Sequence, residues 1–551
     1  MVPFHYAGDI AVGLPLYNWL FAFLSPHRFQ GMRQGCPGTA ATQRQYFEHP
    51  RSHLIRRRDG GNSEPVDAPS MEEGQVTGAQ VAGDVDKVVH KKHLSALMLM
   101  ALMYTYTISG AYAIEETVLG GGPLLGIISI FIIPIFMSAP TAIIVSEMAT
   151  ALPSNAAFLM WYSIAFHSVV YFVMVILSLL LIFVDNALYS VLISEYICSA
   201  TTCSETTNKL LRAGMLLLTY TLNIIGIEAV GNVSIVLSFV TLFPFLLLFA
   251  VHLVKGGFYL NWPAISYIPS TIDWATFITT SSWNLCGLEQ AATVVEEVKT
   301  PRKTFLRALV PLLALAYLTY IPPILTGSSV RRGPPDLSEW TTGFWSHVAW
   351  IVGGLPMQMI MVCASALSAM GLMLSTLCTT THVIAGVAYT EVFPGPINRI
   401  LYRRNKRFGT YHWTLTINAL ITGLFGVFFD FGPLVKVDQV LYALRVIMIF
   451  ISFLVIRHRY PHLERPFKVP LEGKQLYMIG IPIVLFVGLL IVAMTHDVQT
   501  VIVNFSVLGA AIVISLVYCL LIKKEGFYGR VVTETIDESM DELDAGSVKT
   551  N

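Results

Sequence analysis

Three carboxylates lie within long apolar stretches of this chain, where a charge is costly. Glu115 is near the end of one such stretch, Asp185 lies inside the run 166–197, and Glu289 lies two residues beyond a glycine in the run 273–295. A carboxylate near the middle of a bilayer costs about 2.5–3.5 kcal/mol on insertion scales unless it is paired or faces water. Acids kept in such positions are typical of cation or proton sites. We therefore expect these three to line a polar cavity and to be the candidates for proton coupling.

Other side chains near these acids extend the candidate site. Glu116 is a weaker fourth acid, because neighbouring residues on a helix point about 100° apart and cannot both face one site. Asp185 and Tyr189 are four residues apart and so share a helix face. Aromatic rings near the acids can add cation–π contacts to an ammonium group, although packing is the simpler explanation for any one of them. These rings belong to Tyr104, Tyr106, Tyr112, Tyr189 and Trp283.

The charge pattern around the acids favours a cationic ligand. No basic residue accompanies the acids of the early apolar segments, so a positively charged organic solute is the expected ligand. Arg445 is the exception, within the segment 437–456. It either pairs with one of the acids as a coupling or gating element or extends its side chain to a membrane interface.

Composition indicates the kind of scaffold that must position these residues. The chain has 551 residues, of which 54% are hydrophobic and 13% charged, whereas globular proteins contain about 25% charged residues. Formal net charge is zero, which gives no support to a nucleic-acid partner. No phosphate-binding, hydrolase or metalloprotease motif is found, and no cysteine–histidine spacing typical of zinc, so we expect neither an enzyme nor a metal or cofactor site. Cys198 and Cys203 either form a disulfide or remain thiols.

Twelve apolar segments indicate a polytopic, all-α membrane protein. The segments are 94–119, 123–149, 166–197, 210–228, 230–254, 273–295, 305–327, 349–389, 413–430, 437–456, 476–495 and 499–522. The loops after the sixth, eighth and tenth segments hold fourteen basic residues, and the loops on the opposite side hold six. Because basic loops stay on the cytoplasmic side, we expect both termini to be cytoplasmic.

The first and sixth segments are interrupted at matching positions. The first breaks at Ser109-Gly110, about fifteen residues past Leu94, and the sixth breaks at 283–287, about fourteen residues past Asp273. Broken helices at corresponding positions, five segments apart, indicate an inverted repeat with a central binding site.

The two ends of the chain differ from the apolar part. We expect residues 1–92 to be a largely disordered cytoplasmic tail, because 51–58 is basic and 60–83 is rich in Gly, Ser, Pro and acids. Residues 93–524 form the expected transporter domain, and 525–551 an acidic cytoplasmic tail.

Motifs along residues 93–523 resemble those of the amino acid–polyamine–organocation superfamily, most closely the polyamine:proton symporters and related permeases of plants and trypanosomatid protists. The motifs are Ser109–Val118, Glu147–Pro153, Val184–Leu192, Trp283–Leu285, Glu296–Val298, Pro301–Thr304 and Glu464–Pro470. The run Asp185–Tyr189 points to the polyamine branch. The sixth segment departs from the family pattern, because Leu288-Glu289 stands where a Trp-Asp pair is common.

The resemblance implies a five-plus-five inverted repeat with two extra helices, and a substrate site between segments 1, 3, 6 and 8. By position it places seven residues in that site: Gly110, Glu115, Asp185, Asn186, Tyr189, Trp283 and Asn284. Ser109, Tyr112 and Glu289 complete the candidate set on the grounds given above. Segment 5 lacks the lysine that some proton-coupled relatives use, so a carboxylate has to carry the proton.

These observations predict a secondary transporter that takes up putrescine, cadaverine or spermidine with protons across the plasma membrane by alternating access. One alternative is an amino acid permease, possibly for cationic amino acids, in which the Ser109–Ala111 backbone holds the substrate carboxylate. Another is a non-transporting nutrient sensor on a permease scaffold.

Overall fold

A computed structural model describes residues 94–108, 110–200, 203–298, 301–495, 498–523 and 527. These residues are almost entirely helical, and the β-type pairing among them is one isolated parallel bridge between Leu94 and Val298. The elements run as follows: α2 (Ala96–Thr107), α3 (Ile114–Ile133), η2 (Pro134–Ser138), α4 (Ala139–Ala151), α5 (Phe158–Ala165), α6 (Ser168–Ala200), α7 (Glu205–Ile225), α8 (Ile227–Lys255), α9 (Trp262–Ile265), α10 (Trp274–Leu285), η3 (Leu288–Glu297), α11 (Pro301–Ser329), η4 (Leu337–Glu339), α12 (Phe344–Tyr389), α13 (Gly395–Leu401), α14 (His412–Phe428), α15 (Phe431–Arg459), η5 (Gly473–Gln475), α16 (Leu476–Met494) and α17 (Val498–Leu521).

The structure supports a multi-pass membrane protein. Eight helical segments among the described residues are long and apolar enough to cross a bilayer, and α2 and α14 are shorter apolar helices. One of the eight, Ile114–Ala151, joins the end of the predicted first segment to the second, with non-helical backbone at Gly122. The count of twelve spans and the inverted repeat stay predictions. The expected tails, 1–92 and 525–551, lie outside the described residues apart from Phe527.

Both predicted helix breaks are present. The first lies between Thr107, where α2 ends, and Ile114, where α3 begins. The second lies between Leu285 and Leu288, beyond which the chain continues as the 3₁₀ element η3. The helices that precede the breaks, α2 and α10, are both 12 residues long.

Local sequence explains where these two helices start and how the second one ends. Ser95 caps α2 by accepting a hydrogen bond from the Met98 amide at 3.3 Å, and Asp273 caps α10 by accepting one from the Thr276 amide at 3.1 Å. After α10, Gly287 adopts a φ of +94°, which favours glycine, and a Cβ atom there would lie 2.9 Å from the Tyr106 ring.

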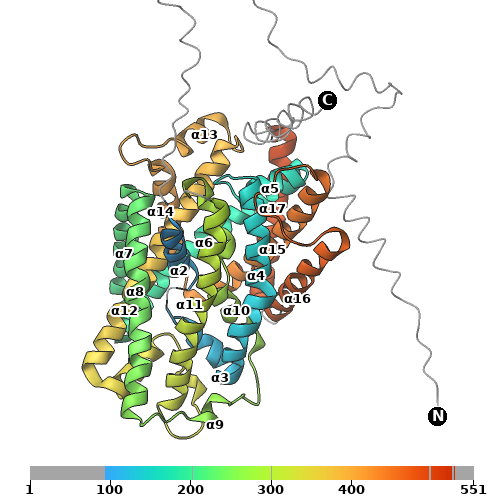
Figure 1. Cartoon of the computed structure of the whole chain (residues 1–551). Coiled ribbons are helices and arrows are strands. Elements are labelled where there is room, and N and C mark those ends of the chain that lie inside the picture. The colour runs from blue at the N-terminus through green and yellow to red at the C-terminus, as the bar shows by residue number, and fades with distance from the viewer. Residues whose placement is uncertain are drawn as a thin grey trace, which may run out of the picture. The chain divides into compact units, whose positions relative to one another are not determined.

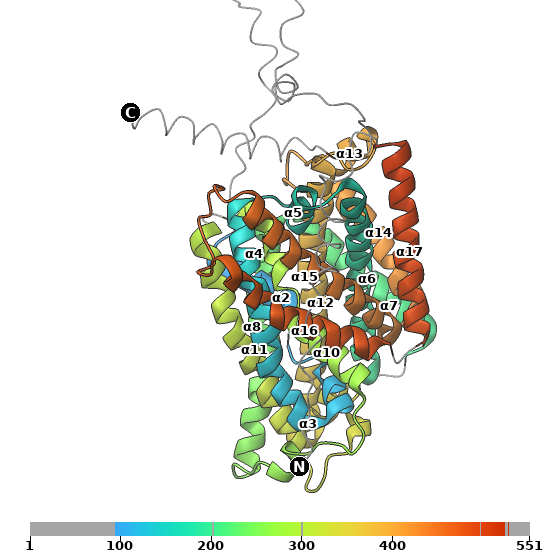
Figure 2. The same ribbon diagram turned by 90° about the vertical axis from the view of Figure 1, so that its right-hand side faces the viewer.

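The helices pack around the two breaks. In Figure 1, α7, α8 and α12 lie on one side of the bundle, and α4, α15 and α16 lie on the other. Within the bundle α10 packs against α3, and α6 packs against α12, α14 and α15. Figure 2 shows α16 running obliquely across the bundle, where it contacts α15 and α10. The outer helix α17 exposes Phe505, Val513 and Leu520, as expected for a surface that faces lipid.

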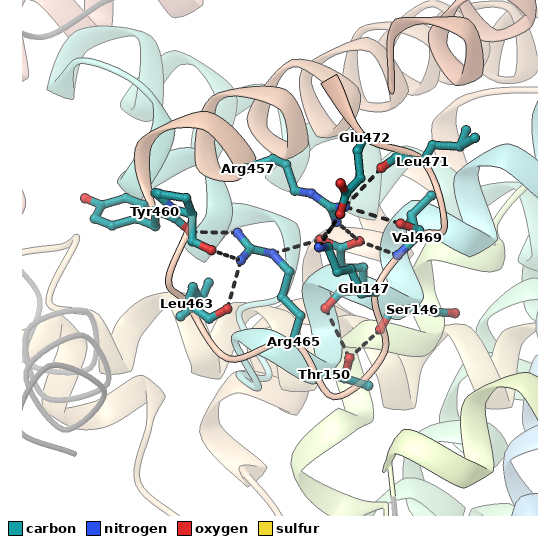
Figure 3. A network of polar contacts seen from close by, with 12 residues as sticks. Ser146, Glu147, Thr150, Arg457, Tyr460, Leu463, Arg465, Val469, Leu471 and Glu472 are labelled. Carbon is teal, nitrogen blue, oxygen red and sulfur yellow. Dashed lines mark hydrogen bonds and ion pairs between the residues drawn. The ribbon is translucent and has the colours of Figure 1, made fainter. Parts of the chain in front are cut away.

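A buried ion cluster connects the end of α4 to the segment between α15 and α16 (Figure 3). Glu147 forms ion pairs with Arg457 and, at 2.9 Å, with Arg465, and it accepts a hydrogen bond from the Val469 amide at 2.7 Å. Two sequence motifs more than 300 residues apart therefore meet, and Glu147 is not part of the lining of the cavity described below. The structure also joins Cys198 and Cys203 in a disulfide.

Candidate functional site

A small cavity with a volume of about 30 Å³ lies beside both helix breaks. Its lining comes from α2, the α2–α3 break, α6, α10, the α10–η3 break, η3, α12 and α15. Six of the predicted site residues are part of this lining: Tyr112, Asp185, Tyr189, Trp283, Asn284 and Glu289. Residues from distant parts of the chain thus meet in one polar space.

Asp185 is held by two tyrosines at one side of this cavity. The Tyr189 hydroxyl, one helical turn further along α6, donates to Asp185 Oδ1 at 2.7 Å. The Tyr106 hydroxyl, from α2, donates to Asp185 Oδ2 at 3.2 Å. Hydrogen bonds from neutral hydroxyls orient the carboxylate without cancelling its charge, so Asp185 remains able to attract a cation.

Glu289 has a different environment, because it faces Arg445. The Arg445 Nη1 atom lies 3.5 Å from Glu289 Oε1, and both side chains are buried, with exposures of 3% and 1%. Tyr442 donates to Glu289 Oε2 at 3.2 Å, and its hydroxyl also accepts the Gly287 amide at 3.2 Å. Of the two possibilities for Arg445, the structure shows pairing with a cavity acid rather than extension to an interface.

Arg445 also contacts two aromatic residues of α5. Its guanidinium lies 4.6 Å from the centroid of the Phe158 ring, and its carbonyl accepts a hydrogen bond from Tyr162 at 3.0 Å. The Nε and Nη2 atoms of Arg445 are buried and have no hydrogen-bond partner. The guanidinium is therefore a fixed positive charge in the cavity wall.

Asp438 is an acid of the cavity that the sequence analysis did not select. It is 2% exposed, and its Oδ2 atom accepts a hydrogen bond from the Gln439 side chain at 3.0 Å, while Oδ1 has no hydrogen-bond partner. Asp438, Tyr442 and Arg445 follow the spacing i, i+4, i+7, which places them on one face of α15. That spacing was available in the sequence and could have identified Asp438.

Side chains satisfy three of the backbone groups freed by the first break. Trp345 Nε1 donates to the Ala111 carbonyl at 2.6 Å, and the Ala113 amide donates to the Tyr196 hydroxyl at 2.8 Å. Asn284 Nδ2, at the second break, donates to the Ala113 carbonyl at 3.2 Å and so connects the two breaks. These side chains supply hydrogen bonds that the interrupted helix cannot make and that lipid cannot provide.

Aromatic rings form part of the cavity wall. The Trp283 ring lies 6.0 Å from the Tyr189 ring and 5.6 Å from the Phe431 ring, measured between centroids. Tyr112 packs edge-on against Tyr196 at 4.9 Å, and these two residues also line a smaller cavity next to Trp345. Tyr112 and Tyr196 therefore form a thin partition between two cavities.

Of the other predicted residues, Asn186, Gly110 and Glu115 are described by the structure and do not line the main cavity. Asn186 donates to Thr380 Oγ1 at 3.1 Å and to Asn418 Oδ1 at 3.2 Å, so it faces α12 and α14. Gly110 lies in the first break with a φ of +99°, and Ser109 lies outside the described residues.

Glu115 lies in the first turn of α3 and also stays outside this lining. It is fully buried, and neither of its carboxylate oxygens has a hydrogen-bond partner. Glu116, next to it, points elsewhere and accepts a hydrogen bond from Thr342 at 3.2 Å. The expectation that these two acids face different surroundings agrees with the structure.

Comparisons with known proteins agree with the geometry. A model of the family described as amino acid permease matches residues 94–521. The polyamine transporter RMV1 of Arabidopsis thaliana is 28% identical over 431 residues, which cover 77% of this chain and 86% of the relative. The polyamine transporter PUT1 of Oryza sativa subsp. japonica is 28% identical over 380 residues, which cover 69% of this chain and 70% of the relative.

Proposed function

The chain belongs to the amino acid permease family, and from that premise we propose that it takes up polyamines by proton symport through alternating access. A multi-pass transporter of this family is not an enzyme, and relatives named as polyamine transporters imply a small organic cation as the substrate. Putrescine, cadaverine and spermidine are the proposed substrates.

One observation carries the proposal, namely the charge of the cavity. Asp185, Glu289 and Asp438 line it together with the single guanidinium of Arg445. With all four groups ionised, the cavity has a net charge of about −2. Charges in a partly buried cavity interact more strongly than in water, so an organic cation is attracted and an anion is repelled.

One backbone amide of the first break is not available to an amino acid carboxylate. Broken helices that hold an amino acid carboxylate do so with free backbone amides. Here the Ala113 amide donates to Tyr196, and the nearby Ala111 carbonyl accepts from Trp345. A polyamine has no carboxylate and needs no such amides.

Glu115, Asp185 and Glu289 remain the proposed proton-coupling residues. Glu115 fits this role best because an ionised carboxylate buried without partners costs several kcal/mol, a cost that binding of a proton removes. Asp185, with two tyrosine hydroxyls, is the proposed ammonium-binding residue.

Alternating access requires contacts that open in turn. On the proposed cytoplasmic side, Glu297 at the end of η3 forms an ion pair with Arg404 at 2.9 Å, and its carbonyl accepts the Leu94 amide at 2.9 Å. On the proposed external side, Tyr112 and Tyr196 separate the main cavity from the smaller one. We propose that α2 and α3 move with α10 and η3 against α6 and α12, with both termini in the cytoplasm and the protein in the plasma membrane.

Purified protein in liposomes tests the proposal. An inward-directed proton gradient is expected to drive accumulation of labelled putrescine, and collapse of the gradient with a protonophore is expected to abolish it. Accumulation of putrescine that does not depend on the proton gradient would exclude proton symport. Inhibition of putrescine uptake by equal concentrations of free lysine or arginine favours a permease for cationic amino acids, and absence of any accumulation favours a sensor.

A further inference from the structure

We propose that Asp438 is a second ammonium-binding residue and that, together with Asp185, it makes the cavity a site for compounds with two positive charges. This inference rests on the proposed function and deepens it, because it states how many charges the preferred substrate carries and which residues bind them. The argument starts from which cavity acids already have a cationic partner.

Glu289 already has a cationic partner in Arg445. Arg445 lies 3.5 Å from Glu289, and its guanidinium is fixed by Phe158. Tyr442 donates a further hydrogen bond to Glu289. A substrate ammonium at Glu289 would have to displace a buried guanidinium, which costs the attraction between two buried charges.

Asp438 and Asp185 have no cationic partner among the described residues. Asp185 receives hydroxyl hydrogen bonds from Tyr106 and Tyr189, and Asp438 receives one amide hydrogen bond from Gln439. The Oδ1 atom of Asp438 is buried and has no hydrogen-bond partner, although the side chain lines the cavity. A buried, partnerless carboxylate oxygen beside a cavity is costly unless a ligand supplies a donor.

Arg445 is too far along α15 from Asp438 to be its cationic partner. Residues seven apart in an α-helix are separated by about 10 Å along its axis, so Asp438 lies about two turns from Arg445. The Arg445 side chain extends instead toward Glu289 of η3 and Phe158 of α5. Asp438 Oδ1 is therefore left available to a donor from a ligand.

Charge counting selects the ligand class. Once Arg445 is assigned to Glu289, two carboxylates remain in the cavity and match two ammonium groups. A diamine such as putrescine satisfies both acids, whereas a monoamine satisfies one. Trp283 and Leu372 also line the cavity, and we propose that the apolar stretch between the two amines lies against them once the cavity widens to admit a diamine.

The test compares putrescine with butylamine, which has the same carbon chain and one amine fewer. Inhibition of labelled putrescine uptake by each compound is measured for wild type, Asp438→Asn and the control Asp336→Asn, whose side chain is exposed in a loop. Surface expression is measured for each variant. In wild type we expect putrescine to bind at least about tenfold more tightly than butylamine, since one ion pair is worth about 1.4 kcal/mol or more in such a site.

Asp438→Asn is expected to weaken the binding of putrescine about tenfold and to leave the affinity for butylamine unchanged, so that the preference for the diamine is lost. Asp336→Asn is expected to keep this preference. A preference that survives in a well-expressed Asp438→Asn variant overturns this inference and leaves the proposed function intact. Equal affinities of wild type for the two compounds overturn it without any variant. Absence of putrescine uptake by wild type overturns the proposed function itself, and this inference with it.

Discussion

The buried pair Glu289–Arg445 gives the sharpest prediction about stability. The two groups are 3.5 Å apart and at most 3% exposed. Removal of one charge from a buried pair leaves the other without compensation and typically costs about 3–5 kcal/mol. We expect Arg445→Gln and Glu289→Gln each to lower the free energy of unfolding by about 3 kcal/mol, at the lower end because Tyr442 still donates to Glu289 in the first variant.

The double variant is expected to be more stable than either single one. Replacing both members of a buried pair removes the uncompensated charge, so we expect a loss of about 1–2 kcal/mol and a coupling energy of about 4–5 kcal/mol. Unfolding is measured on purified protein by titration with a denaturing detergent, followed by tryptophan fluorescence. The matched control is the exposed pair Arg331–Glu339, whose side chains are 52% and 33% exposed and whose neutralisation is expected to cost less than about 1 kcal/mol.

The double variant also tests how the cavity recognises its substrate. The double variant keeps Asp185 and Asp438 and therefore the net charge of about −2 in the cavity, so it is expected to retain the preference for putrescine over butylamine. Effects of the two single changes that add up within about 0.5 kcal/mol would refute the energetic coupling. Loss of the diamine preference in a stable double variant would refute the assignment of Arg445 to Glu289.

Three further predictions concern single residues. Asp185→Asn is expected to raise the KM for putrescine by about 10- to 100-fold with normal surface expression, since a charge-assisted contact worth about 1.5–3 kcal/mol is lost; an unchanged KM in uptake assays would contradict the ammonium site. Glu115→Gln is expected to bind putrescine normally but to lose the stimulation of uptake by a proton gradient in liposomes; stimulation equal to wild type would exclude Glu115 as the proton carrier. Tyr196→Phe leaves the buried Ala113 amide without its partner and is expected to lower the free energy of unfolding by about 1–3 kcal/mol in detergent titration, whereas wild-type stability would show that the amide finds another acceptor.

The helix breaks were predictable because their signals are local. Small residues interrupt apolar runs at Gly110 and at Gly287, and both interruptions appear in the structure as chain segments between helices. Asp185 and Tyr189 were likewise predictable as neighbours, because a spacing of four residues brings two side chains to one helix face.

Partners across helices were not predictable from local signals. Arg445 had several acids as possible partners, and only packing of α15 beside η3 selects Glu289. Asn186 follows Asp185 directly, yet the rotation of about 100° per residue turns it toward Thr380 and Asn418. Asp438 lies near the start of an apolar segment, where an acid is easily taken for a helix-end residue. Its spacing to Tyr442 and Arg445 pointed to the cavity, and its position within α15 (Phe431–Arg459) shows that it lies in the bundle.

The way the first break is satisfied bears on which solute the cavity recognises. Broken membrane helices leave polar backbone groups that must bind either a ligand or the protein itself. Here Trp345, Tyr196 and Asn284 occupy three of these groups, which are therefore not available to a ligand in this conformation. Recognition then falls to the carboxylates of the cavity, and carboxylates select positive charge without requiring any other functional group. A carrier built this way accepts a solute that consists of amines on a hydrocarbon chain, and it discriminates among such solutes by the number and spacing of their charges.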